Sequence, residues 1–434
     1  MSEAVSRTMD ALCTITAPQM GGTNLGLLHL LWALVSGTLL PSRGALFPAL
    51  QASGLLPAAV RRAWAALRFG SWEIAELLAA WAQYLTAEQQ WQQPVYDGYR
   101  PKAVDLAPFW RPAWQGCRTK HFYAPAGKAL RAVVLGLIAR VGRVGSQRVA
   151  VLTDLVRSDP TDPAESALRA RVVERVAQTL AADEMPVFDA GFKIREFQAA
   201  KLLRYEVRLA KNFTARRSTL PEYKGKGRKP EYGELVRPLA RQYQGKTIPA
   251  TAPDQVETWT TAGQEFRAEV WNDLVLSNVK VTPELAVFHV AAVHDPRYQE
   301  PWLLASPVNL TGAAWHGLYH ARWPIEQPPL AAKQMLGAAR QFVSASESCH
   351  RLPELSLLAG SILTYLAATL PAVPTGFWDR QPKPTPGRLR RVLAGVPFPH
   401  TYRLPPRLRE KASVTAHLPK GILGHRRQKR ASSA

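Results

Sequence analysis

A change of hydrophobic period near residue 96 constrains the fold most. Before it, apolar residues recur every three or four positions, which predicts helices and no strands. In this first part we expect three helices: one from Thr23 or Asn24 to about Leu39, one from Pro57 to Leu67, and one from a Ser71 cap to Leu85. We therefore expect residues 1–95 to form an all-helical domain.

From Tyr99 onward, short apolar runs alternate with turn residues and one longer helical pattern. The first run is Ala103 to Ala107. The next elements are a hairpin (Val133 to Val141, turn Gly142 to Gly145, Val149 to Leu152), a helix (Pro163 to Leu180), a strand (Met185 to Phe188), a helix (Ile194 to Leu203) and a strand (Tyr205 to Leu209). Three strands, a helix, a strand, a helix and a strand resemble the α/β core of ribonuclease H-like proteins.

A basic segment then interrupts this alternation. Ten Lys and Arg stand against three Glu between Lys211 and Lys246, and Trp259 to Val279 alternates like a pair of strands. We predict a mainly β insertion at 212–284 within a catalytic core of 96–211 and 285–345. The core resumes with strands at Leu285 to Val293 and Trp302 to Val308. A helical C-terminal region at 346–434 ends in a basic tail, Arg426 to Arg430.

Composition narrows the class of protein. The formal net charge of +22 indicates a polyanionic partner, most commonly nucleic acid. Cys13, Cys117 and Cys349 have no disulfide or zinc spacing, which favours a reducing compartment. The apolar run from Leu25 to Leu40 is too short and too interrupted to span a bilayer, and no signal peptide opens the chain. We expect a cytoplasmic protein with no membrane partner.

The most informative stretch for chemistry is Tyr319 to Lys333. On a continuous helix, Tyr319, Arg322 and Glu326 at i, i+3 and i+7 would share one side, a mixture suited to holding a metal and clamping phosphates. Proline interrupts the pattern at 324, 328 and 329. The last two prolines could instead begin a second helix, which would place Lys333 on a different axis.

Three carboxylates have surroundings that suggest metal binding. Asp105 lies inside an apolar strand, Asp189 ends a buried strand beside Ala190 and Gly191, and Glu326 follows Arg322. Converging carboxylates can hold two Mg²⁺ or Mn²⁺ about 3.5–4 Å apart for phosphoryl transfer. Taken singly, each also fits a turn or an ion pair. Asp97 competes with Asp105 as the first aspartate, although the glycine beside it indicates a turn.

The spacing Y-x2-R-x3-E-x6-K, filled by Tyr319, Arg322, Glu326 and Lys333, resembles the signature of DDE transposases from cut-and-paste bacterial insertion sequences. The resemblance implies that Asp105, Asp189 and Glu326 are catalytic and bind the two ions, and that the protein acts as a homodimer on double-stranded transposon ends and target DNA. It implies phosphate contacts by Tyr319, Arg322 and Lys333, and a base-stacking tryptophan, either Trp271 or Trp302. It also implies that the protein is bacterial and nucleoid-associated. The basic side chains of the insertion expected to bind DNA are Arg216, Arg217, Lys224, Lys226, Arg228 and Lys229.

Two other functions fit the same residues. A structure-directed DNA endonuclease would use the same carboxylates with water alone, whereas a transposase also joins 3′-hydroxyl ends to target DNA. A transposase-derived DNA-binding protein would have lost catalysis altogether. Arg61, Arg62 and Arg68, beside a short turn between two helices, are compatible with a helix-turn-helix DNA reader, and equally with plain bundle packing.

Overall fold

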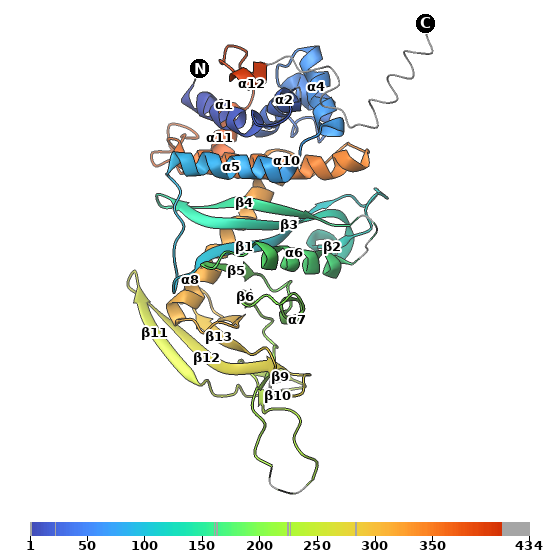
Figure 1. Cartoon of the computed structure of the whole chain (residues 1–434). Coiled ribbons are helices and arrows are strands. Elements are labelled where there is room, and N and C mark those ends of the chain that lie inside the picture. Colours follow the sequence, from blue (N-terminus) through green and yellow to red (C-terminus); the bar gives the residue numbers. More distant parts are fainter. Residues whose placement is uncertain are drawn as a thin grey trace. The chain divides into compact units, whose positions relative to one another are not determined.

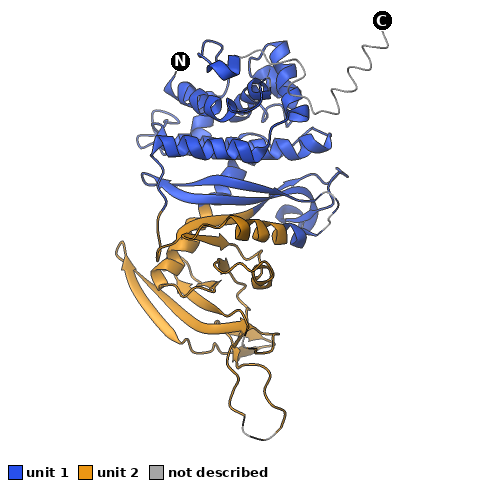
Figure 2. Cartoon of the chain, in the orientation of Figure 1, with its two compact units in different colours: residues 1–93, 106–168, 324–434 blue, residues 94–105, 169–323 orange. Residues whose placement is uncertain are grey.

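The chain is a mixed α/β protein with a large mixed sheet, and it forms two compact units (Figure 2). Unit 1 comprises Met1–Gln93, Leu106–Leu168 and Pro324–Ala434, and unit 2 comprises Pro94–Asp105 and Arg169–Trp323. Each unit is thus assembled from segments that are distant in sequence. The computed structural model describes residues 2–21, 23–159, 161, 164–223, 225, 227–282 and 284–409.

The N-terminal part of unit 1 is helical, as predicted (Figure 1). Its helices are α1 (Glu3–Thr16), α2 (Thr23–Val35), α3 (Leu46–Ala52), α4 (Pro57–Phe69) and α5 (Ile74–Glu88). Helix α2 is apolar almost all round and nearly every residue in it is buried, which is typical of the central helix of a bundle. The expected Ser71 cap is wrong, because α5 begins later, after Glu73, and the Ser71 hydroxyl donates to Met20 Sδ at 3.3 Å.

Helix α10 (Ser346–Thr369) is the longest helix of unit 1. It is long and apolar enough to cross a membrane, but 89% of its most apolar window is buried inside the described structure, as in the core helix of a soluble protein. The ten residues before α10, 336–345, are not helical. After α10 come a proline-rich loop, α11 (Pro386–Leu393) and α12 (Pro406–Arg409). The predicted basic tail lies outside the described residues.

The predicted hairpin is present in unit 1, with longer strands than expected. Strand β3 (Lys128–Val144) pairs antiparallel with β4 (Gln147–Arg157), and the turn is centred on Gly145, whose φ is +56°. Gly142 belongs to the strand rather than the turn. A Cβ there would stand 2.5 Å from the Trp91 indole, so this glycine makes room for packing. Strand β2 (Lys120–Tyr123) also pairs with β3. The 3₁₀ turn η1 (Ala124–Ala126) follows β2 along the chain.

Strand β1 (Arg100–Trp110) runs through both units, and its first half begins the sheet of unit 2. It pairs in parallel with β5 (Glu184–Phe188), which pairs in parallel with β6 (Glu206–Arg208). Helices α6 (Glu165–Thr179) and α7 (Ile194–Ala199) precede β5 and β6, so the predicted order of strand, helix, strand, helix and strand is confirmed.

The insertion is mainly β, as expected, and most of its strands extend the same sheet, whereas the strands at 241–243 and 246–248 form a separate two-stranded sheet. The predicted strand pair is β11 (Gln255–Thr261) with β12 (Gln264–Leu276), and β12 pairs antiparallel with β13 (Phe288–His294). Strand β14 (Trp302–Ser306) joins β13 to β6. The remaining short strands are β7 (Ala215–Arg217), β8 (Leu235–Val236), β9 (Arg241–Tyr243) and β10 (Lys246–Ile248).

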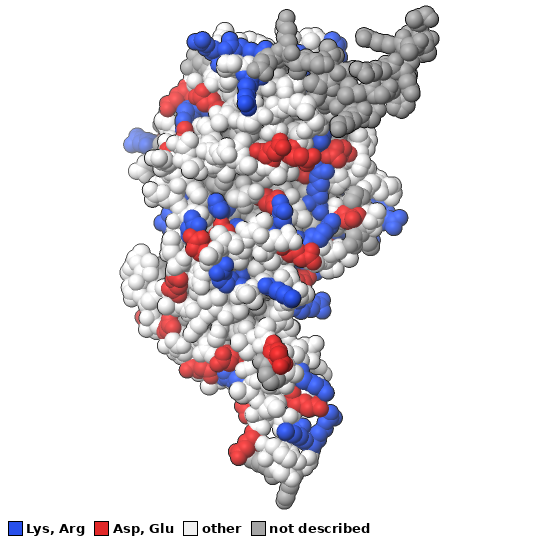
Figure 3. All heavy atoms as spheres, viewed as in Figure 1, with Lys and Arg blue, Asp and Glu red and all other residues white. Residues whose placement is uncertain are grey.

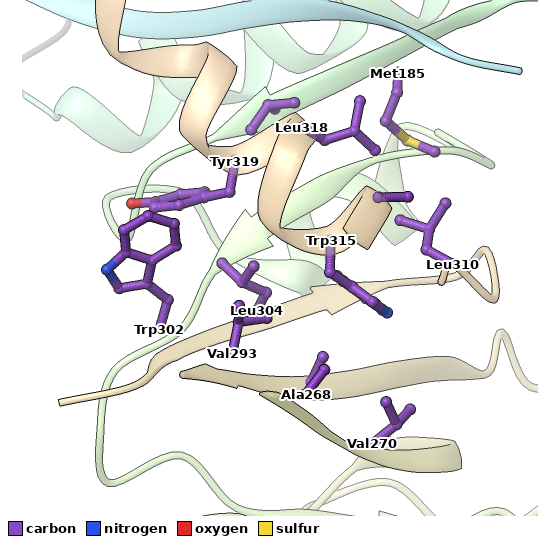
Figure 4. Packing of buried hydrophobic residues seen from close by; sticks show 13 residues of the cluster. Met185, Ala268, Val270, Val293, Trp302, Leu304, Leu310, Trp315, Leu318 and Tyr319 are labelled. Carbon is purple, nitrogen blue, oxygen red and sulfur yellow. The ribbon is translucent and has the colours of Figure 1, made fainter. Parts of the chain in front are cut away.

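Helix α8 (Gly312–Arg322) packs on one face of this sheet, and Figure 4 shows the contact. Its Trp315, Leu318 and Tyr319 side chains lie in one buried cluster with residues of four strands. The partners from the sheet are Met185, Val187, Ala268, Val270, Ala291, Val293, Trp302 and Leu304. Burying these side chains on one face fixes the position of the last turn of α8 relative to the ends of β1, β5 and β6.

In unit 1, a buried ion pair between β4 and α10 provides a test of how this helix packs on the hairpin. Glu354 on α10 is wholly buried, and its carboxylate accepts from Arg157 Nε at 2.5 Å and Nη2 at 2.8 Å. Glu354→Ala would leave a guanidinium that is only 36% exposed without its partner, so we expect a loss of about 2 kcal/mol in the free energy of unfolding measured in urea. Glu347→Ala is the control, because Glu347 is 45% exposed and contacts Arg157 at 3.0 Å and Arg351 at 2.9 Å. Arg157 keeps Glu354 and Arg351 keeps the carbonyls of Leu67 and Trp72, so this change should cost less than about 1 kcal/mol. Equal losses would contradict this account.

Candidate active site

Two of the three predicted carboxylates occupy matching positions on neighbouring strands. The parallel register pairs Val104 of β1 with Phe188 of β5, so Asp105 and Asp189 are the next residues along each strand. Neighbouring strands lie about 4.8 Å apart. The structure therefore brings Asp105 and Asp189 together at one edge of the parallel strands, as the sequence predicted for a shared site.

Arg208 continues the same row and was not singled out from the sequence. Phe188 is paired with Val207 of β6, so Arg208 occupies the next position beside Asp189. Its Nη1 lies 3.4 Å from Tyr319 Oη, and its guanidinium carbon lies 5.9 Å from the centroid of that ring. The sequence did contain a signal for Arg208, because a charged residue in the predicted strand Tyr205 to Leu209 requires a partner.

Helix α8 supplies two further predicted residues to this row. Arg322 donates from Nη1 to Asp105 Oδ2 at 3.0 Å, and both side chains are largely buried, with 7% and 19% exposure. The Arg322 guanidinium carbon also lies 5.8 Å from the Tyr319 ring centroid. Tyr319 thus has two arginines close to its ring. Its ring is buried and its pKa is raised by that burial, although the neighbouring Arg322 and Arg208 oppose the shift.

The turn after β5 orients Asp189. Gly191 N donates to Asp189 Oδ1 at 2.9 Å, and Phe192 N donates to the Asp189 carbonyl at 3.3 Å. A Cβ at Gly191 would stand 3.0 Å from the same Oδ1, so a larger residue would crowd the carboxylate. The local sequence Asp-Ala-Gly therefore holds the side chain by a hydrogen bond within the turn.

Asp97, the competing candidate for the first aspartate, has a structural role. It lies in a tight turn with φ of +47°, followed by Gly98 with φ of +81°, as the neighbouring glycine indicated. Its carboxylate accepts from Thr311 N at 2.8 Å and from Thr311 Oγ1 at 3.0 Å, immediately before α8. A carboxylate at a helix N-terminus stabilises the helix dipole and its unpaired amides.

Glu326 and Lys333 belong to unit 1, beyond the end of α8. The expected single helix carrying Tyr319, Arg322 and Glu326 is wrong, because α8 ends at Arg322 and Glu326 closes the 3₁₀ turn η2 (Trp323–Glu326). Pro324 lacks the N–H that would continue the α-helical hydrogen bonds. Pro328 and Pro329 begin the short helix α9 (Gln327–Leu330), the alternative that the sequence left open.

Lys333 lies in the π-helical turn η3 (Ala331–Met335) and packs on aromatic rings. Its Nζ is 5.3 Å from the Phe109 ring centroid and 5.1 Å from that of Trp110, both at the end of β1. This contact fixes the ammonium group against the strand that also carries Asp105. Glu326 itself is exposed.

The donor chemistry of the Asp105–Asp189 pair fits a hard divalent cation, which prefers carboxylate oxygens. Arg322 already provides a positive charge to Asp105 in this conformation. Within the described ranges, no three or more His, Cys, Asp or Glu residues are grouped to hold a metal ion. The three-carboxylate site with two ions therefore stays a prediction.

The two candidate stacking tryptophans are both buried. Trp271 is wholly buried, and its Nε1 donates to the carbonyls of Thr251 and Ala252 at 3.1 and 3.0 Å. Trp302 is 4% exposed and lies parallel to the His316 ring, with centroids 5.4 Å apart. In this conformation each ring serves the packing of unit 2, and base stacking by either stays a prediction.

The basic side chains of the insertion differ in their surroundings. Arg216 donates to the carbonyls of Ser277 and Gly233, and Arg217 forms a bidentate pair with Asp254. Arg228 is 80% exposed, with Glu231 at 3.0 Å, and Lys229 is exposed. Lys224 and Lys226 lie outside the described residues. Figure 3 shows Lys and Arg interspersed with Asp and Glu over the face drawn, so the surplus charge is not gathered into one field there.

Comparison with known proteins adds no family to this description. No protein-family model matches the chain, and no curated protein matches its sequence. The interpretation of the site therefore rests on its residues and their geometry.

The different surroundings of the two first-aspartate candidates predict different phenotypes. Asp97→Ala removes the bonds to Thr311 and should lower the free energy of unfolding by about 1 kcal/mol, as for the loss of other helix caps. If the site cleaves DNA as the sequence predicts, cleavage should persist in this variant at a temperature where it remains folded. Asp105→Ala should abolish cleavage. Thermal unfolding and a cleavage assay on the same samples measure both effects, and loss of cleavage in folded Asp97→Ala alone would reverse the assignment.

Proposed function

We propose that the protein is a metal-dependent DNA transposase of the DDE type, with a ribonuclease H-like core, that cuts at terminal inverted repeats and transfers the ends to target DNA. One observation carries the proposal. Asp105 and Asp189 stand side by side on parallel strands, with Arg322 and Tyr319 of α8 against them. The tyrosine and arginine are the first two members of the Y-R-E-K spacing. The element order of β1, β3, β4, α6, β5, α7 and β6 supports the ribonuclease H-like core.

In this proposal the chain's own residues bind and orient the DNA. Asp105 and Asp189, with Glu326 as the third ligand, would hold Mg²⁺ or Mn²⁺. Bound divalent ions supply Lewis-acid stabilisation of the phosphate and lower the pKa of the attacking water or 3′-hydroxyl. Arg322 lies within 3.0 Å of Asp105, close enough to transfer its hydrogen bond from that carboxylate to a DNA phosphate oxygen when an ion binds. Lys333 would contact the same strand as a point charge.

Arg208 adds a second guanidinium group close to the Tyr319 ring. Two guanidinium groups within 6 Å of one buried ring form a pair of phosphate donors held at a fixed spacing. The Tyr319 hydroxyl accepts from Arg208, which orients that arginine. Tyr319 therefore acts as a positioning residue for the arginines rather than as a nucleophile.

A second candidate, a DNA-binding protein descended from a transposase and without catalysis, is favoured by one observation. The Arg322–Asp105 pair is largely buried and already satisfies part of the charge on the first aspartate. If that pair were permanent, the site would bind DNA without cutting it. A structure-directed endonuclease would share the carboxylates and differ only in its inability to join ends.

The test is a plasmid assay with the DNA that flanks the reading frame, incubated with the full chain and Mg²⁺. Nicked, excised and joined products are expected, and Asp105→Ala, Asp189→Ala and Glu326→Ala should each lower cleavage by about a thousandfold or more, since metal-held carboxylates supply several kcal/mol. Binding of the same DNA in EDTA should persist.

The outcomes separate the candidates. Cleavage without joining of supplied 3′-hydroxyl ends would favour the endonuclease. Binding with no cleavage, and no effect of the three substitutions, would establish the non-catalytic protein. Arg322→Lys serves as the matched variant, because it keeps the charge but loses the planar guanidinium, and should weaken cleavage more than it weakens binding.

A further inference from the structure

A loop joins α10 to α11 in unit 1 (Figure 1), and it presents two aromatic side chains to solvent. Phe377 is 94% exposed and Trp378 is 67% exposed. The two rings pack edge to face, with centroids 5.1 Å apart and planes at 78°. An apolar patch exposed on a folded surface often marks a binding site, so this aromatic pair is a candidate for one.

The loop is built to hold these rings outward. Asp379 Oδ2 accepts from Thr375 N at 3.0 Å, from Thr375 Oγ1 at 3.1 Å, and from Arg388 Nη2 at 2.8 Å. Arg388 also donates to the Val373 carbonyl at 3.1 Å, which ties the loop to α11. A Cβ at Gly376 would stand 2.4 Å from the Trp378 indole, so this glycine lets the ring lie against the backbone. The polar groups of the turn face inward and the rings face solvent.

The charge around the rings identifies the kind of partner. From Pro371 to Arg391 the cationic residues are Arg380, Lys383, Arg388, Arg390 and Arg391, and the acidic residue is Asp379. Asp379 is engaged by Arg388, whereas Arg380, Lys383 and Arg391 are exposed. Aromatic faces flanked by cations suit a chain that carries both flat rings and negative charges. Such a ligand is single-stranded nucleic acid, since paired bases in a duplex offer no free face.

We propose that Phe377 and Trp378 form a stacking platform for unpaired DNA bases, with Arg380 and Lys383 contacting the adjoining phosphates. This site is separate from the carboxylate row and needs no metal. Binding there is independent of sequence, because every base has a face on which an aromatic ring can stack. Its failure would leave the proposed catalytic function untouched, and the reverse also holds.

The test compares two fluorescein-labelled probes of equal length and charge, dT12 and an abasic 12-mer, by fluorescence anisotropy with the full chain in EDTA. The wild-type chain should bind dT12 about 5- to 100-fold more tightly than the abasic strand, the range expected for stacking of one or two bases. The double variant Phe377→Ala/Trp378→Ala should bind both probes equally. Phe342→Ala is the matched control, because Phe342 is 72% exposed and lies outside the loop, and it should keep the preference.

Salt dependence separates the two parts of the site. Arg380→Ala and Lys383→Ala should each lower the slope of log affinity against log salt by about 0.7, the value for one phosphate of a single strand. The aromatic variant should leave that slope unchanged. Both rings are exposed, so circular dichroism should show the same fold.

Two results would overturn the proposal. One is an aromatic variant that keeps the dT12 preference. The other is a wild-type chain that self-associates without DNA in sedimentation velocity and becomes monomeric on Trp378→Ala, which would make the rings a contact with a second copy.

Discussion

The parallel register of β1, β5 and β6 is the constraint on which the rest of the site depends. A shift of one residue in either pairing would move every side chain of that strand to the opposite face of the sheet. The pairing of Val104 with Phe188, and of Phe188 with Val207, is what makes Asp105, Asp189 and Arg208 neighbours. Apolar residues just before each of these positions fix the register, because Val104, Phe188 and Val207 are all wholly buried.

Helix α8 depends on the same sheet for its position. Its N-terminus is held by Asp97 through Thr311, and its buried face packs on β5, β13 and β14. The last turn then delivers Arg322 to Asp105. Pro324, two residues later, cannot continue the helical hydrogen bonds, so α8 ends at Arg322 and this residue lies in the last turn. Packing at one end of α8 thus sets the geometry at the other.

Local pattern predicted β3, β5, α6 and β12 well, because β3 and β5 contain unbroken apolar runs, α6 repeats apolar residues every four positions, and part of β12 alternates. It misplaced features decided by distant contacts. Gly142 read as a turn residue, yet Trp91 requires it within a strand. Trp271 and Trp302 are stacking candidates whose hydrogen bonds and ring contacts lie inside unit 2, and base stacking by either stays a prediction. Arg208 was missed because the pairing register of β6 with β5 is what places it beside Asp189, and sequence spacing does not encode that register.

The Arg322–Asp105 pair also bears on how a site of like charges can fold before any cation arrives. Asp105 and Asp189 on adjacent strands repel one another, and burial strengthens that repulsion. An arginine held at 3.0 Å from Asp105 offsets part of it. Because Arg322 also contacts the Tyr319 ring, its guanidinium keeps a partner when it leaves the carboxylate. In the proposed transposase, the same side chain would stabilise the protein before ions bind and would contact a DNA phosphate once the carboxylates hold the ions.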